Sequence, residues 1–312
     1  MKGRVWGAHL GLLAVLALAH FLLPDYHHNN VAKVMVLACY AMGYNIAFGY
    51  TGLLSLGHAL FFASGLYATA LSINLLGWSA GPALILGLVA GAVMAVAVGL
   101  LALRTAGVAF MIVTLMFAQA GYLTILYLGQ WTRGDEGIVI AQGLRVVAGV
   151  DLSAEGPRYL AALALFGAGL LANLWLVRSP FGRVMVAMRE NEARARMLGY
   201  DPFRVKLAAL AMSGLYAGAA GAAYAVMFGY AGASLAGVQY SILPMLWVLL
   251  GGAGTVMGPF IGCLLMFYLV AYSANVTTAS LLVVGLVLVA LVLFAPKGLL
   301  GSLRARGVTW LP

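Results

Sequence analysis

Residues 81–103 read GPALILGLVAGAVMAVAVGLLAL and contain no charged side chain. A helix rises about 1.5 Å per residue, so about 20 apolar residues cross the roughly 30 Å hydrocarbon core of a bilayer. This stretch is therefore predicted to be one membrane-spanning helix. A membrane β-barrel would show short strands in which apolar and polar residues alternate.

Similar apolar runs recur along the chain, which has 312 residues, of which 64% are hydrophobic and 8% charged. Globular domains carry about 25% charged residues. We therefore predict an all-α polytopic integral membrane protein, with residues 1–312 in a single membrane domain of about ten transmembrane helices. The spans are placed at 8–23, 31–49, 54–75, 81–103, 106–129, 158–177, 206–229, 240–253, 257–273 and 279–295.

Residues 240–253 are short for a span and would also fit a re-entrant or broken helix. The positive-inside rule favours counting them as a crossing, because Lys and Arg gather in cytoplasmic loops. Ten crossings from a cytoplasmic N-terminus place 13 of the 17 basic residues inside and put the C-terminus there too. Four basic residues then lie outside, namely Lys33, Arg133, Arg145 and Arg158.

The same topology explains the net charge of +9, so no nucleic-acid partner is predicted. Lys2 and Arg4 precede an apolar run as in a signal peptide, but no small-residue cleavage site follows it. We interpret this run as an uncleaved first span. The long loop at about 130–157 is external and rich in glycine, which indicates turns and a short strand or helix.

All eight carboxylates lie in loops or at span ends, and the middle of the spans offers no Asp, Glu, Lys or Arg. Ion-coupled secondary transporters need such a group near the midplane, and His58 alone is a weak substitute. Neither a G-x-x-x-x-G-K-[ST] phosphate loop nor a metal or catalytic cluster is present. We therefore expect no enzyme activity and no cofactor of its own, and a secondary transporter or an intramembrane enzyme is the disfavoured alternative.

Ten of the 25 charged residues lie between positions 178 and 206. Ser179-Pro180 and Asp201-Pro202 each fit a helix cap followed by the first helical residue, and Gly199 fits a C-terminal cap. The pattern predicts a helix through 183–190 and a short transverse helix at 192–198. The alternative is a solvated loop that obeys the positive-inside rule.

The short helix would carry an apolar tip at Met197 and Leu198, with Glu192, Arg194 and Arg196 as a charged rim. A plain linker would need neither this length nor this number of helix starts and stops. The segment is therefore predicted to be a docking element for a partner protein that drives the membrane domain.

Three glycines, Gly49, Gly52 and Gly57, bracket Thr51 and Ser55 near the end of the second span. This composition fits a broken helix whose free backbone groups line a cavity and meet a substrate carboxylate. It fits equally a tight cytoplasmic turn between two spans. Both interpretations remain open on the sequence alone.

Polar residues are rare inside the spans, and each can line a pathway or form a hydrogen bond between helices. The pathway candidates are Asn45, Thr51, Gly52, Ser55, His58, Thr114 and Gln119. Small residues at four-residue spacing predict close helix packing; these pairs are Gly87/Gly91, Gly214/Gly218 and Ala217/Gly221.

Four segments resemble the permease family of branched-chain amino acid ABC importers, specifically its LivM-type half. They read GYTGLLSLGHA at 49–59, RTAGVAF at 104–110, SPFGR at 179–183 with RENEA at 189–193, and LGGAGT at 250–255. FAPKGL at 294–299 completes a match that covers nearly the whole chain in order.

The resemblance implies a subunit of the bacterial inner membrane that passes branched-chain or related amino acids, with urea, short amides or other amino acids as alternatives. It implies a heterodimer with a LivH-type permease, two cytoplasmic ATPases that use the ATP, and a periplasmic or lipoprotein substrate-binding protein. It also implies that a cytoplasmic helix sits in a groove of one ATPase. The residues that match this helix are Arg189, Glu190, Asn191, Glu192, Ala193, Arg194, Met197, Leu198 and Gly199.

Overall fold

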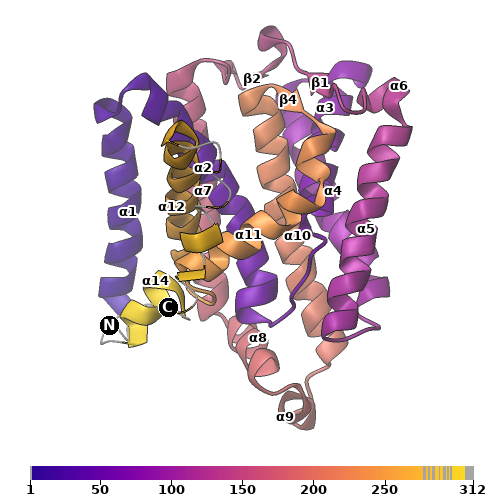
Figure 1. Ribbon diagram of the computed structural model, residues 1–312, viewed down its shortest axis with the longest axis vertical. Coiled ribbons are helices and arrows are strands. Elements are labelled where there is room, and N and C mark those ends of the chain that lie inside the picture. Colours follow the sequence, from indigo (N-terminus) through magenta and orange to yellow (C-terminus); the bar gives the residue numbers. More distant parts are fainter. Residues whose placement is uncertain are drawn as a thin grey trace.

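The computed structural model describes residues 2–276, residues 297–305 and a few positions between 279 and 295. Within this part, eight helices are long and apolar enough to cross a membrane. They are α1 (Lys2–Leu22), α2 (Asp25–Asn45), α3 (His58–Leu76), α4 (Ala80–Ala102), α5 (Val108–Tyr127), α7 (Glu155–Arg178), α10 (Pro202–Phe228) and α12 (Gly258–Val276). The predicted all-α polytopic fold is confirmed, and the predicted span at 279–295 lies largely outside the described residues (Figure 1).

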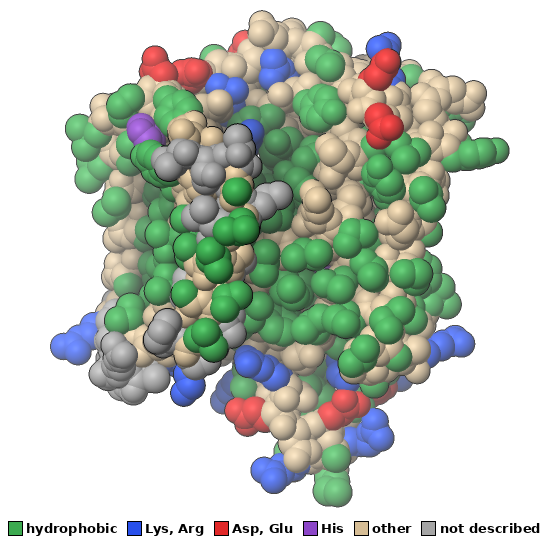
Figure 2. Space-filling view, viewed as in Figure 1, with side chains coloured by type: hydrophobic (Ala, Val, Ile, Leu, Met, Phe, Trp, Pro, Cys, Tyr) green, Lys and Arg blue, Asp and Glu red, His purple; other side chains and the backbone are tan. Residues whose placement is uncertain are grey.

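Charged side chains gather at the two ends of the helical bundle, and a hydrophobic band separates them in Figure 2. One end carries α8 (Pro180–Glu190) and α9 (Glu192–Met197), and we call it the α9 end. The opposite end carries the loop after α5, and we call it the loop end. A short helix, α14 (Gly298–Ala305), packs against α11 (Val238–Gly251) and α12.

The loop end corresponds to the predicted loop at 130–157 and contains α6 (Gly129–Thr132) and a 3-10 turn, η2 (Gln142–Leu144). Strand β1 (Ile138–Val139) pairs with β4 (Tyr230–Ala231), which directly follows α10. A small hairpin joins β2 (Val146–Val147) to β3 (Val150–Asp151). The β1–β4 pair fastens the loop onto the end of α10, whereas β2 and β3 contact α4 and α7.

The predicted span at 240–253 is a broken crossing. From β4 at the loop end the chain enters the bundle through a 3-10 turn, η3 (Ala233–Ala236), and only then forms α11. Fourteen helical residues at about 1.5 Å each reach about 21 Å, which is less than the hydrocarbon core. The non-helical stretch before α11 therefore supplies the rest of the crossing.

Helix α2 lies at the centre and is buried along almost its whole length, whereas the outer faces of α1, α4 and α5 are exposed. Helices α4 and α10 form the closest pair. A Cβ placed on Gly91 would lie 2.4 Å from Gly218 Cα, and one on Gly214 would lie 2.6 Å from the carbonyl oxygen of Gly91. The predicted small-residue packing is confirmed for these glycines.

We predict that Gly91→Ala destabilises the protein by about 1–3 kcal/mol, because the added methyl group forces two packed backbones apart. Thermal unfolding of the purified chain in detergent measures the effect. Gly81→Ala is the matched control in the same helix, since no atom lies within 4 Å of its added methyl group. Equal melting temperatures for the two variants would contradict this account of the α4–α10 contact.

Candidate functional site

The segment between α7 and α10 has the helix boundaries that the sequence predicts. Ser179 Oγ accepts a hydrogen bond from the Gly182 amide at 3.1 Å, and Asp201 Oδ1 accepts one from the Phe203 amide at 3.0 Å. Gly199 ends the short helix with a φ of 91°, a conformation that favours glycine. The predicted caps are confirmed, so the segment is a folded element rather than a loose loop.

A further cap was not anticipated from the sequence. Asn191 Oδ1 accepts a hydrogen bond from the Arg194 amide at 2.9 Å and begins α9. A cap of this kind stabilises a helix by about 1 kcal/mol. It fixes the sharp change of direction between α8 and α9.

The tip of α9 presents apolar side chains away from the bundle. Met197 is 86% exposed and Leu198 is 73% exposed, and α9, which ends at Met197, lies at the end of the molecule beyond α8 (Figure 1). Figure 2 shows a hydrophobic tip here, with charged side chains around its base. An exposed apolar pair of this kind outside the hydrocarbon band fits a protein partner better than lipid.

Glu192 faces back toward α10 rather than outward. Its carboxylate contacts Lys206 Nζ at 2.5 Å and Arg196 Nη2 at 3.5 Å. Arg194, by contrast, is exposed on the rim. The two residues that the sequence grouped as one charged rim thus have different surroundings, and Glu192 ties α9 to the first turn of α10.

The side chain of Arg189, at the end of α8, contacts the helical turn that extends α2. Its Nη1 donates a hydrogen bond to the carbonyl oxygen of Gly49, in the π-helical turn η1 (Ile46–Tyr50) that extends α2. A Cβ on Gly52 would lie 3.2 Å from Arg189 Cγ, and Gly52 has a φ of 76°. The segment between α7 and α10 therefore contacts the point where the helical structure after α2 ends.

Residues 51–57, which we call the break, run without helical structure between η1 and α3. They begin with a turn, in which the Gly52 amide donates to the carbonyl oxygen of Phe48 at 3.0 Å and the Leu53 amide donates to that of Ala47 at 2.8 Å. Gly52 lies beside Arg189, whereas Leu56 donates its amide hydrogen bond to Thr114 Oγ1, two turns into α5. The chain thus turns back into the bundle before α3 begins.

Hydroxyl side chains accept hydrogen bonds from two backbone amides of the break and from one amide in the first turn of α3. Besides Thr114, Ser55 Oγ accepts from the Gly57 amide at 3.1 Å, and Ser241 Oγ of α11 accepts from the Ala59 amide at 3.0 Å. These three amide groups are therefore already bonded within the chain. The predicted free amides that would meet a substrate carboxylate are not found at these positions.

Asn45, the last residue of α2, holds the end of that helix against the loop that follows α11. Its Nδ2 donates to the carbonyl oxygen of Thr255 at 2.9 Å, and its Oδ1 accepts from the Gly254 amide at 2.9 Å. Thr51 Oγ1 donates to the carbonyl oxygen of Ile46 at 3.0 Å. Both side chains are buried and act here as structural hydrogen-bond partners.

His58 opens α3 in the fully buried core, where His58 Nε2 and Ser213 Oγ of α10 lie 2.7 Å apart. The ring of Tyr44 packs edge-on against it at 4.6 Å between centroids. Gln119 lies half-buried on α5, next to Ala118. Neither His58 nor Gln119 lines the cavity that Thr51 and Gly52 share.

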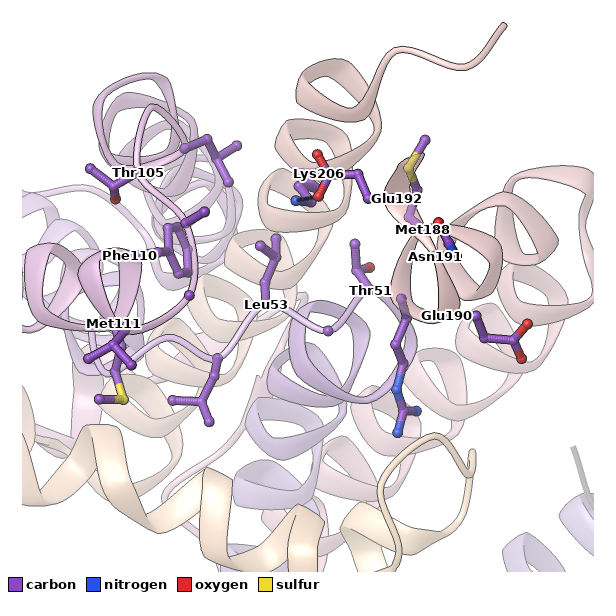
Figure 3. Close-up of a pocket in the computed structure, with 17 residues that line it drawn as sticks. Thr51, Leu53, Thr105, Phe110, Met111, Met188, Glu190, Asn191, Glu192 and Lys206 are labelled. Carbon is purple, nitrogen blue, oxygen red and sulfur yellow. Dashed lines mark hydrogen bonds and ion pairs between the residues drawn. The ribbon is translucent and has the colours of Figure 1, made fainter. Parts of the chain in front are cut away.

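A cavity of about 510 Å³ lies between the break, the start of α5 and the α8–α9 junction. Thr51 and Gly52 line it, whereas the other five pathway candidates do not. Figure 3 shows Leu53 and Thr51 between Phe110 of α5 and Asn191. The sequence missed Ser213, Ser241 and Thr255; the only signal for them was a hydroxyl group in an apolar run.

The sequence profile of a known family, described as "Branched-chain amino acid transport system / permease component", matches residues 28–295. The chain belongs to this family. The branched-chain amino acid permease protein LivM of Escherichia coli K12 is 28% identical to it, over 94% of this chain and 75% of that protein. The permease protein LsrC of the autoinducer 2 import system of Klebsiella pneumoniae is 35% identical over 30% of this chain and 29% of its own length.

A probable branched-chain amino acid permease LivM of Methanocaldococcus jannaschii is 33% identical over 28% of this chain and 26% of its own length. No solved structure matches the chain. The family assignment therefore depends on the sequence match, and the geometry of the site comes from this structure. The resemblance to the permease family predicted from the four motifs is confirmed.

We predict that Asn45→Ala frees the loop after α11, because it removes two buried hydrogen bonds and leaves their partners unsatisfied, at about 1–3 kcal/mol each. Hydrogen exchange at the Gly254 amide should become at least tenfold faster. Asn74→Ala is the control, since Asn74 makes one exposed hydrogen bond to Val139 at the loop end. Unchanged exchange at Gly254 would show that Asn45 does not hold this loop.

Proposed function

We propose that this chain is the membrane-spanning subunit of an ABC importer that passes branched-chain amino acids into a bacterial cell across the inner membrane. Its family is one of permease components, and the relatives that match 94% and 95% of this chain are named for branched-chain amino acid transport. The capped α9 with its apolar tip carries the proposal from the structural side. With α9 in the cytoplasm, both termini are cytoplasmic and the loop end is external.

Under this proposal the chain works with four other proteins: a LivH-type permease, two ATPases and a substrate-binding protein. It needs no cofactor of its own, because the ATPases bind the ATP. In the described part of the chain no three His, Cys, Asp or Glu side chains lie close enough to hold a metal ion. The energy for transport therefore enters through the α9 end.

The contacts suggest how motion of an ATPase would reach the bundle. Movement of α9 acts on α10 through the Glu192–Lys206 ion pair and on the break through Arg189 and Gly49. Asn45 then passes the movement to the loop after α11. Two states of the bundle with different contacts to the ATPase are sufficient for such coupling.

The decisive experiment is uptake of labelled leucine into proteoliposomes that hold the five-protein assembly. Uptake should require ATP and should cease when this chain is omitted. Urea and acetamide serve as alternative substrates in the same assay. Uptake by this chain alone, driven by an ion gradient without ATPases, would reject the proposal in favour of a secondary transporter.

Replacement of the tip by Met197→Ser with Leu198→Ser should weaken ATPase binding at least tenfold, since each buried apolar side chain contributes about 1.5–3 kcal/mol. Co-purification of the ATPases with the double variant measures this. Leu144→Ser is the control, because Leu144 is a similarly exposed apolar residue at the opposite end. If the double variant recovers as much ATPase as the wild type, the assignment of α9 as the docking element is wrong.

Arg189→Met should separate ATP hydrolysis from transport. The variant keeps the α9 tip, so ATPases should still bind and hydrolyse ATP, but leucine uptake per ATP should fall at least fivefold. Arg183→Met removes an exposed arginine from the same helix without touching Gly49 and should leave the ratio unchanged. If both variants transport normally, the contact between Arg189 and Gly49 carries no coupling.

A further inference from the structure

Three basic side chains from separate elements converge at the loop end, around the last residues of α10. Lys33 Nζ of α2 lies 5.3 Å from the ring centroid of Phe228, and Arg158 Cζ of α7 lies 5.9 Å from it. Arg145, between η2 and β2, packs on Gly229, where a Cβ would lie 2.7 Å from its Nη1. We call Lys33, Arg145 and Arg158 the cation cluster.

The cation cluster lacks acceptors. Arg145 is 8% exposed, yet its guanidinium forms no hydrogen bond or ion pair with any described residue, and its Nε is buried. Lys33 likewise has no acceptor in the described part of the chain and contacts only the rings of Tyr224 and Phe228. The Nε of Arg158 is also buried without a partner. Buried charged donors are normally paired or hydrogen-bonded.

The nearby carboxylates do not complete the pairing. Glu155 is half-exposed and lies 3.9 Å from Arg158 Nη2, at the limit of an ion pair. Asp151 is exposed and lies within electrostatic range of Arg145 without forming an ion pair, and its Oδ1 accepts a hydrogen bond from the Ser153 amide at 2.8 Å. Arg158 meanwhile lies within electrostatic range of both Lys33 and Arg145. The cluster thus holds excess positive charge that an added anion would neutralise.

The donor types indicate the anion. A guanidinium fork matches the two oxygens of a carboxylate, and the lysine ammonium adds a third donor direction. The rings of Tyr224 and Phe228 lie beside the charges and offer an apolar surface to the rest of the ligand. Because Arg145 is nine-tenths buried, a small molecule reaches the cluster more readily than a side chain on a docked protein.

We propose that the cation cluster binds the carboxylate of the amino-acid substrate as it enters the membrane subunit. The inference rests on the proposed function, which makes the loop end external, and it assigns Lys33, Arg145 and Arg158 as substrate-binding residues. Sequence reasoning had only placed these three among the basic residues outside.

The first experiment tests the site without transport. Thermal unfolding of the purified full chain in nanodiscs is followed with acetate or acetamide at constant ionic strength, because a ligand that binds the folded state raises the melting temperature. Acetate should raise it by several degrees and acetamide should not. The rise should be lost in Arg145→Gln and in Lys33→Gln, and kept in Arg133→Gln, which alters an exposed arginine of the same loop.

The second experiment asks which carboxylate the site receives. In the five-protein assembly, Arg145→Gln should raise the leucine concentration for half-maximal uptake at least tenfold while the binding protein still associates. Loss of binding-protein association with unchanged leucine dependence would assign the cluster to a protein carboxylate and overturn the proposal. An acetate effect that persists in both cluster variants would also overturn it.

The two experiments separate this inference from the proposed function. If the wild-type assembly transports no leucine but acetate still stabilises the chain through the cluster, the substrate assignment fails and the anion site stands. If leucine is transported with the same concentration dependence in Arg145→Gln, the importer stands and the cluster is not its substrate site.

Discussion

A backbone that leaves its helix inside hydrocarbon must find hydrogen-bond partners within the protein, because no water is present to supply them. The architecture of this permease follows from that constraint. At the break, residues 51–57, Ser55 and Thr114 supply hydroxyl oxygens to two amides, and Ser241 supplies one to the Ala59 amide in the first turn of α3. Those hydroxyls come from the break itself, from α5 and from α11, so three parts of the bundle meet at one interruption. The interruption between α2 and α3 is therefore a junction where α5 and α11 are hydrogen-bonded to the chain.

The junction receives contacts from the α9 end and from the middle of the bundle. At the α9 end, Arg189 contacts Gly49 where α2 stops, and Asn45 joins that region to the loop after α11. Nearer the middle, α3 and α11 begin side by side through the contact between Ala59 and Ser241. Both helices start inside the bundle, and neither is bound to its predecessor by continuous helical hydrogen bonding. A shift of the docking segment can therefore be taken up at the interruptions while the long helices stay intact.

The sequence predicted those features that depend on local chemistry. Apolar length located the spans, Ser179 and Asp201 marked helix starts, and Gly91 with Gly218 marked a close contact. It did not predict the partners of Asn45, because Thr255 stands 210 positions further along the chain. Nor could composition decide between a tight turn alone and a longer interruption after α2, since glycine suits both. Pairings across the bundle are set by packing, which a periodic pattern does not encode.

The exposed Met197–Leu198 pair has a consequence for the life of the newly made chain. Until a partner protein covers Met197 and Leu198, these apolar side chains are exposed to water. Exposed apolar surface of this kind favours association with chaperones, with proteases or with a second copy of the chain. Chaperones or proteases that bind the exposed Met197–Leu198 pair would then distinguish unassembled subunits from assembled ones. If the proposed ATPases dock on α9, the side chains that receive their force would also mark those chains that have not yet assembled with them.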